Sequence, residues 1–89
     1  MKAGRIPCCV PFCGRTFKAE GGDVELMCGK HWRLARPALR RRHTRVVRRC
    51  RAAILKKDWR TAERAWRLEN AIWAAIKRQA TEVAAGIAG

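Results

Sequence analysis

Two short stretches of sequence decide the fold: CCVPFCGR at residues 8–15 and MCGKHW at residues 27–32. The first contains two cysteines separated by four residues, beside a third cysteine, and the second contains a cysteine and a histidine separated by two. Two close pairs of soft ligands, with fourteen residues between the pairs, are typical of a tetrahedral structural zinc site. We expect one structural Zn²⁺ with the ligands Cys8, Cys13, Cys28 and His31.

The local sequence suits both ligand pairs. Gly14 directly follows Cys13 and permits the positive φ angle that a metal-binding turn often needs. The i, i+3 spacing of Cys28 and His31 lets both side chains share one face of the first turn of a helix. At that position the positive end of the helix dipole also favours a thiolate.

Three other residues leave alternatives open. Cys9 and Cys13 are separated by three residues, so Cys9 can replace Cys8, although the four-residue spacer forms the better-known knuckle. Otherwise Cys9 is a spare ligand or a free thiol. His43 is an alternative to His31, and Cys50 falls in an apolar row, where a cysteine is usually a small buried hydrophobe.

The order of knuckle, hairpin and Cys-x2-His resembles a treble-clef zinc finger, in which a helix supplies the last two ligands from its first turn. Residues 8–17 alone also resemble the opening of a two-Cys, two-His finger, but the second ligand pair departs from that pattern. The Cys-x2-His-Trp motif before an arginine-rich helix is similar to small zinc-binding proteins of phages and prophages, over about residues 8–50. The resemblance implies a nucleic-acid binder, a ribosomal protein, an interaction module or a nuclease.

A nuclease is the least compatible of these classes. It needs a further histidine on the hairpin and an open metal position, but residues 14–27 contain no histidine and four protein ligands close the site. We therefore expect no enzymatic activity, and no small-molecule substrate.

Residues 1–7 contain no apolar signal region and no run of apolar residues is long enough for a membrane span. We expect a cytoplasmic protein, in a bacterial host if phage-encoded, where cysteines bind metal rather than pair.

The charge is concentrated in the middle of the chain. The 89 residues include 21 Lys and Arg against 7 Asp and Glu, a formal net charge of +14. Residues 30–57 contain twelve basic side chains and no acidic one. Because like charges at this density repel each other, they indicate a polyanionic partner.

The predicted fold class is a small α-rich (α+β) protein: a zinc knuckle and β-hairpin followed by an antiparallel helical hairpin. We expect strands at residues 15–18 and 23–27 joined by Gly21-Gly22, and a short helix at 29–35. Pro37 suits the first turn of a main helix over 37–56. Asp58 would cap the third helix and Gly86 would end it. The chain thus divides into a zinc-binding module (1–36), an arginine-rich helix (37–57) and a Trp-rich amphipathic helix packed on it (58–86).

Each long helix has an apolar row at helical spacing. The row of the main helix contains Leu39, His43, Val46, Val47, Cys50 and Ile54. The row of the third helix contains Trp59, Ala62, Trp66, Trp73, Ile76, Ala80 and Val83, and is widened by Ala65, Ile72 and Ala75. We expect the two rows to form the core, with exposed tryptophans contacting a partner as the alternative.

Arginines dominate the basic segment, and arginine forms bidentate contacts with phosphate. We expect a nucleic-acid-binding protein, a regulator or accessory factor that contacts the backbone of DNA or RNA with little base readout. The predicted contact residues are Lys30, Arg33, Arg36, Arg40, Arg41, Arg42, Arg45, Arg48, Arg49 and Arg51. The rival interpretations are an adaptor or inhibitor that binds an acidic protein surface, and a structural component of a larger assembly.

Overall fold

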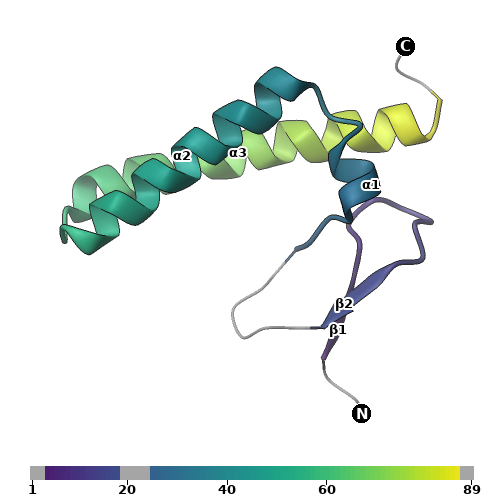
Figure 1. The fold of residues 1–89 in the computed structure, drawn as a ribbon, viewed down its shortest axis with the longest axis horizontal. Coiled ribbons are helices and arrows are strands. Elements are labelled where there is room, and N and C mark those ends of the chain that lie inside the picture. Colours follow the sequence, from purple (N-terminus) through teal and green to yellow (C-terminus); the bar gives the residue numbers. More distant parts are fainter. Residues whose placement is uncertain (1–3, 19–24, 87–89) are drawn as a thin grey trace.

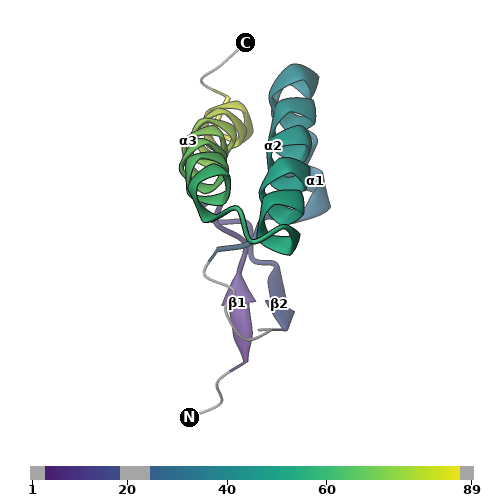
Figure 2. The ribbon, with the colours of Figure 1, turned by 90° about the vertical axis from the view of Figure 1, so that its left-hand side faces the viewer.

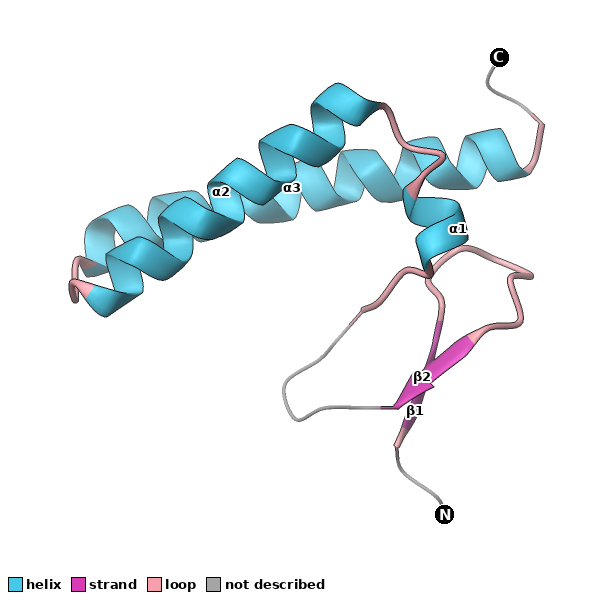
Figure 3. Ribbon diagram, in the orientation of Figure 1, coloured by secondary structure: helices cyan, strands magenta, loops and turns pink. Residues whose placement is uncertain are grey.

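A computed structural model describes residues 4–18 and 25–86 (Figures 1 and 3). Its elements are β1 (Arg5–Pro7), β2 (Thr16–Lys18), α1 (Gly29–Trp32), α2 (Pro37–Leu55) and α3 (Trp59–Ala84). A small hairpin thus precedes helices, and the small α+β fold class is confirmed. None of the helices within the described ranges is both long and apolar enough to cross a membrane.

The β-hairpin differs from the predicted one. Strand β2 pairs antiparallel with β1, with Ile6 opposite Phe17, and not with residues 25–27, the described part of the predicted partner strand. Within the described part of that second segment, Leu26 forms an isolated parallel bridge with Cys8, and the Cys9 N–H donates to the Leu26 carbonyl at 2.8 Å. The knuckle itself is the turn of the hairpin, because the Cys8 N–H donates to Arg15 at 2.8 Å. The predicted Gly21-Gly22 turn lies outside the described residues.

Helix α1 ends at Trp32, three residues before the predicted end. The next residues form turns, in which the Leu34 N–H donates to His31 and the Ala35 N–H donates to Trp32. Arg36 is extended, with φ −59° and ψ 137°, as expected for a residue before proline. Pro37 then begins α2 in the favoured first turn.

The connection between α2 and α3 is a tight turn. Lys57 has φ +58°, its N–H donates to Ile54, and the Asp58 N–H donates to Ala53 at 2.9 Å, which is the Schellman pattern at a helix end. Asp58 caps α3 as predicted, because its carboxylate accepts from the Thr61 N–H at 3.2 Å. The turn reverses the chain, so that α2 and α3 run antiparallel side by side (Figures 1 and 2).

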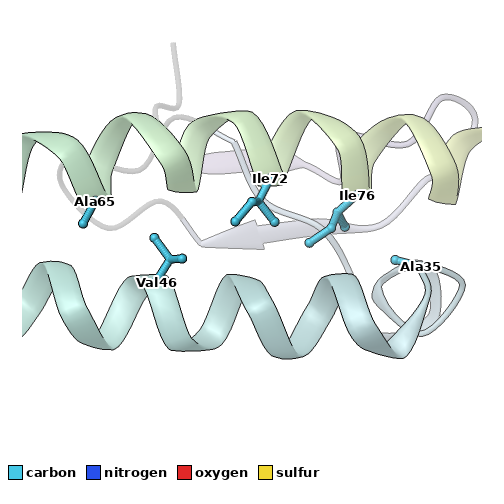
Figure 4. Close-up of a cluster of buried hydrophobic side chains, with 5 residues drawn as sticks. All are labelled: Ala35, Val46, Ala65, Ile72 and Ile76. Carbon is cyan, nitrogen blue, oxygen red and sulfur yellow. The ribbon is translucent and has the colours of Figure 1, made fainter.

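One cluster of buried side chains joins α2 to α3 (Figure 4). It consists of Ala35, Val46, Ala65, Ile72 and Ile76, with Leu39 and Cys50 packed against it. A second cluster, of Cys8, Val10, Cys28 and Ala80, attaches the knuckle to α3. The metal-binding module is therefore packed against the C-terminal half of α3.

The core prediction is wrong at three residues. Ile54 is 46% exposed, Trp59 is 61% exposed and Trp66 is 55% exposed, whereas Ala53 and Ala62 are buried. Small side chains let two helices approach closely, and the large side chains beside them are then left at the rim of the contact. The other two tryptophans, Trp32 and Trp73, stack at 6.4 Å between ring centroids and are partly buried.

Candidate metal centre

Four side chains from distant parts of the sequence converge in one cluster. The ligand atoms of Cys8, Cys13, Cys28 and His31 all lie within 4.8 Å of one another. His31 Nδ1 is 3.1 Å from Cys28 Sγ and 3.7 Å from Cys8 Sγ, and Cys13 Sγ is 3.7 Å from Cys28 Sγ. Three sulfurs and one nitrogen at this separation can hold a metal ion, as in a zinc finger.

Local structure fixes each ligand. Cys8 follows β1, and Cys13 lies after a tight turn in which its N–H donates to Val10 at 3.2 Å. The turn needs two positive φ angles, +65° at Phe12 and +80° at Gly14. Cys28 precedes α1, which contains His31, as the i, i+3 spacing predicts.

The environment of the cluster favours at least one thiolate. Burial raises the pKa of Cys28, but hydrogen bonds from the His31 backbone N–H, Cys13, the His31 ring and Cys8 outweigh burial and lower the pKa to about 6. At Cys13 the hydrogen bond from the Arg15 backbone is the largest single effect, and it lowers the pKa. Burial and the Cys28 and Cys8 thiols together outweigh this hydrogen bond, so the pKa of Cys13 is raised overall. Several thiolates this close repel each other, and a divalent cation removes that repulsion.

The cluster is shielded from solvent on most sides. Cys28 is 1% exposed, Cys8 is 7% exposed and His31 is 8% exposed, while Cys13 is half-buried. The Cys28 N–H also donates to Cys8 Sγ at 3.3 Å, a contact that orients this sulfur. Buried, protein-supplied ligands with backbone support are typical of structural metal sites.

The alternative ligands lie outside the cluster. Cys9 is adjacent in sequence but does not join it, and burial, together with Glu25 and Cys8, raises the pKa of Cys9 to about 11. The His43 ring packs beside the stacked pair of indoles, 5.7 Å from Trp32 and 5.9 Å from Trp73 between centroids. Burial lowers the pKa of His43, so a neutral ring packed against these two indoles is favoured.

A polar clamp that the sequence did not predict ties the second ligand pair to α3. Glu25 Oε1 accepts from Trp73 Nε1 at 2.6 Å, and Glu25 Oε2 accepts from Lys77 Nζ at 2.7 Å. The Lys77 and Trp73 contacts lower the pKa of Glu25. Because Glu25 and Trp73 are far apart in sequence, helical periodicity gave no signal for this pair.

The structure gathers some of the predicted arginines and separates others. A groove of about 550 Å³, which we call the α2 groove, runs beside α1 and α2 and is lined by Trp32, Pro37, Arg40, Arg41, Thr44, Arg45 and Arg48. Arg40 Nε donates to the Ala35 carbonyl at 3.2 Å, which fixes this side chain at the groove. The remaining predicted contact residues do not line the α2 groove: Lys30, Arg33, Arg36, Arg42, Arg49 and Arg51.

No protein-family model, curated protein or solved structure matches this chain.

Proposed function

We propose that the protein is a zinc-stabilised nucleic-acid-binding protein whose α2 groove binds the phosphate backbone. The observation that supports this most strongly is the convergence of four arginines, Arg40, Arg41, Arg45 and Arg48, in one groove. Four guanidinium groups in one concave surface form a site for several phosphates of a polyanion.

Zinc is the metal that the donor set favours. Thiolate sulfur selects soft metals, and three cysteines with one histidine match a common tetrahedral zinc set. When bound, the ion would supply no chemistry beyond holding the ligands together. The protein's own residues then act as an accessory factor or regulator, and we propose no catalytic step.

The metal cluster and the α2 groove are connected through α1. His31 is in the cluster, and the next residue, Trp32, forms one wall of the groove. A metal ion that fixes α1 therefore also fixes an aromatic wall beside the arginines. This connection explains why an arginine-rich helix would be joined to a metal-binding module rather than stand alone.

The groove favours backbone contacts over base readout. The Thr44 hydroxyl, the one hydroxyl among the lining side chains, donates to the Arg40 carbonyl at 3.1 Å, so its proton is already used. Base edges are read by side-chain donors and acceptors that reach into a groove of the nucleic acid. We therefore expect binding of both DNA and RNA with little sequence preference.

The test is a salt titration with zinc-loaded protein that has been freed of nucleic acid. Four phosphate contacts on duplex DNA give a log–log slope of about −4 for the association constant against salt. Replacement of Arg41, Arg45 and Arg48 by Gln removes three of these contacts and should bring the slope to about −1.

A matched control keeps the loss of charge the same. Arg33, Arg42 and Arg49 are exposed and lie outside the α2 groove, so their replacement by Gln should leave the slope close to that of the unmodified protein. Equal losses in the two triple variants would mean that net charge, and not the groove, determines binding. An unmodified protein that binds neither DNA nor RNA near physiological salt would contradict the proposed function.

A further inference from the structure

The N-terminal part of α3 has two parallel rows of exposed side chains that are not buried between α2 and α3. Trp59, Glu63 and Trp66 follow each other at steps of four and three residues, and Arg60, Arg64 and Arg67 repeat this spacing one residue later. Residues at these steps lie above one another on a helix. A row of two tryptophans therefore runs beside a row of three arginines.

The two tryptophans are exposed to a degree that the fold does not require. Trp59 is 61% exposed and Trp66 is 55% exposed, whereas Ala62 and Ala65 of the same turns are buried. Small alanines thus fill the buried positions of these turns, and more than half of the surface of each tryptophan stays exposed. Large apolar side chains that stay exposed together mark a binding surface more often than singly scattered ones.

One of these tryptophans borders a groove of about 460 Å³, the α3 groove, which is lined by Trp59, Arg60, Glu63, Arg64 and Arg67. Trp66 lies outside this lining and directly precedes Arg67 in the sequence. Glu63 accepts from Arg67 at 2.8 Å, so the one carboxylate of the lining is already paired. With three arginines and one glutamate, the lining is positive and complements an anionic occupant.

We propose that the α3 groove, together with the exposed Trp66 beside it in the tryptophan row, binds single-stranded nucleic acid, with bases stacked on Trp59 and Trp66 and phosphates on the arginine row. Aromatic platforms beside a cationic track are how proteins bind single strands without sequence choice. Seven residues of helix place the two indoles about 10.5 Å apart along the axis, roughly the length of three stacked nucleotides. This inference rests on the proposed function but assigns it a second groove and a strand preference.

The two grooves make different demands on the ligand. Arginines of the α2 groove contact phosphates, which duplexes and single strands both present. Stacking on Trp59 or Trp66 needs an unpaired base, because the faces of bases in a duplex are covered by their neighbours. Figure 1 places the start of α3 at the turn with α2, at the opposite end of the helical hairpin from α1 and the knuckle.

The experiment compares binding of a labelled oligothymidylate of about twelve nucleotides with binding of a labelled duplex. The variants are the double replacement of Trp59 and Trp66 by Ala and, as the matched control, their double replacement by Phe. We expect each Ala replacement to weaken single-strand binding by about 5- to 150-fold. The Phe variant should keep most of the affinity, and duplex binding should change little in both.

Each outcome separates the two proposals. Unchanged single-strand binding by the Ala variant, with its helicity and zinc content intact, would overturn the α3 groove and leave the proposed function standing. Equal losses on single strand and duplex would also overturn it, because stacking would not explain them. Single-strand binding that the Ala replacements abolish, with no duplex binding by the unmodified protein, would support the α3 groove and contradict the α2 groove. Binding to neither ligand would contradict both, and would leave an acidic protein surface as the occupant.

Discussion

The two ends of the helical hairpin are built from similar sequence but are buried very differently. At the end near the knuckle, Ile76 and Ala80 of α3 are both 0% exposed. At the far end, Leu55 is 85% exposed, and Trp59 and Trp66 are more than half exposed. Both ends have an apolar row with helical periodicity, so periodicity does not account for the difference.

The difference in burial comes from a third layer of structure, formed by the knuckle and α1, which packs on α3 at one end only. Near the knuckle, Met27 and Trp32 pack against the cluster that contains Ile76, and Cys8, Val10 and Cys28 pack on Ala80. These residues come from the segments that the metal ligands organise. At the far end, α2 and α3 pack only against each other among the residues that the structure describes, and two antiparallel helices bury just one stripe each. Packing of the knuckle and α1 on α3 therefore accounts for the greater burial of α3 at the end near the knuckle.

Loss of the metal should have the largest effect on the difference in burial between the two ends of the helical hairpin. Cys28→Ala removes a ligand that is 1% exposed, and structural zinc contributes about 10–16 kcal/mol to the folding of small zinc-binding peptides. We expect loss of stoichiometric zinc and loss of amide protection in the knuckle and around Ala80, while α2 and the start of α3 stay helical. Zinc analysis and hydrogen exchange measure both effects.

Cys9→Ala is the matched control for the metal prediction. Cys9 lies beside Cys8 but outside the ligand cluster, so this variant should keep its zinc and its protection near Ala80. If Cys9→Ala loses zinc and Cys28→Ala retains it, the ligand cluster is assigned incorrectly.

Isoleucines at the two ends should differ in their contribution to stability. Ile76→Ala leaves a cavity at a fully buried position and should lower the free energy of unfolding by about 2–5 kcal/mol. Ile54 is 46% exposed, so Ile54→Ala should cost less than about 1 kcal/mol. Denaturant titration of the zinc-loaded proteins gives both values, and equal losses would mean that the far end is buried in solution.

The sequence predicted what depends on short-range spacing. Helices α2 and α3, the Asp58 cap and the residues that meet at the metal cluster all follow from motifs of a few residues. The errors have a different origin. The sequence pattern predicts that residues 15–18 pair with residues 23–27, but the knuckle reverses the chain after Cys8 and brings Thr16–Lys18 beside β1 at Arg5–Pro7.

The same limit explains why periodicity wrongly predicts Trp59 and Trp66 in the core, while Ile76 and Ala80 of the same row are buried as predicted. Periodicity shows that Trp59, Trp66 and Ile76 lie near one face of a helix, but it contains no information on which segment covers that face. The clamp from Glu25 to Trp73 and Lys77 joins residues about fifty positions apart. Such contacts follow from the way the metal module lies on α3, which a single sequence does not specify.

The Glu25 clamp should make a small, pH-dependent contribution to the stability of the end of the helical hairpin near the knuckle, and none at the far end. Its ion pair with Lys77 is partly exposed, so Glu25→Gln should cost about 1 kcal/mol or less near neutral pH. The Lys77 and Trp73 contacts lower the pKa of Glu25, so the clamp stabilises the fold above the ordinary carboxyl pKa, and this is lost as the pH falls through the lowered value.

The measurement for Glu25 is the difference in unfolding free energy between the unmodified protein and Glu25→Gln across pH. Because both proteins contain the same metal ligands, acid release of the metal affects both and cancels in the difference. We expect this difference to shrink toward zero in acid. A difference that is independent of pH would show that the carboxylate charge contributes nothing to the clamp.

The smallest predicted effect is at the far end, where a replacement should stabilise the protein and not destabilise it. Lys57 adopts φ +58° in the turn between α2 and α3, a conformation that costs a side chain about 1–2 kcal/mol and glycine almost nothing. Lys57→Gly should therefore raise the free energy of unfolding, by about 1 kcal/mol or less once the greater freedom of glycine in the unfolded chain is counted. Lys56, at φ −86°, is the matched control, and Lys56→Gly should destabilise the same turn. If both replacements destabilise the protein equally, the tight turn with Lys57 at positive φ does not form in solution.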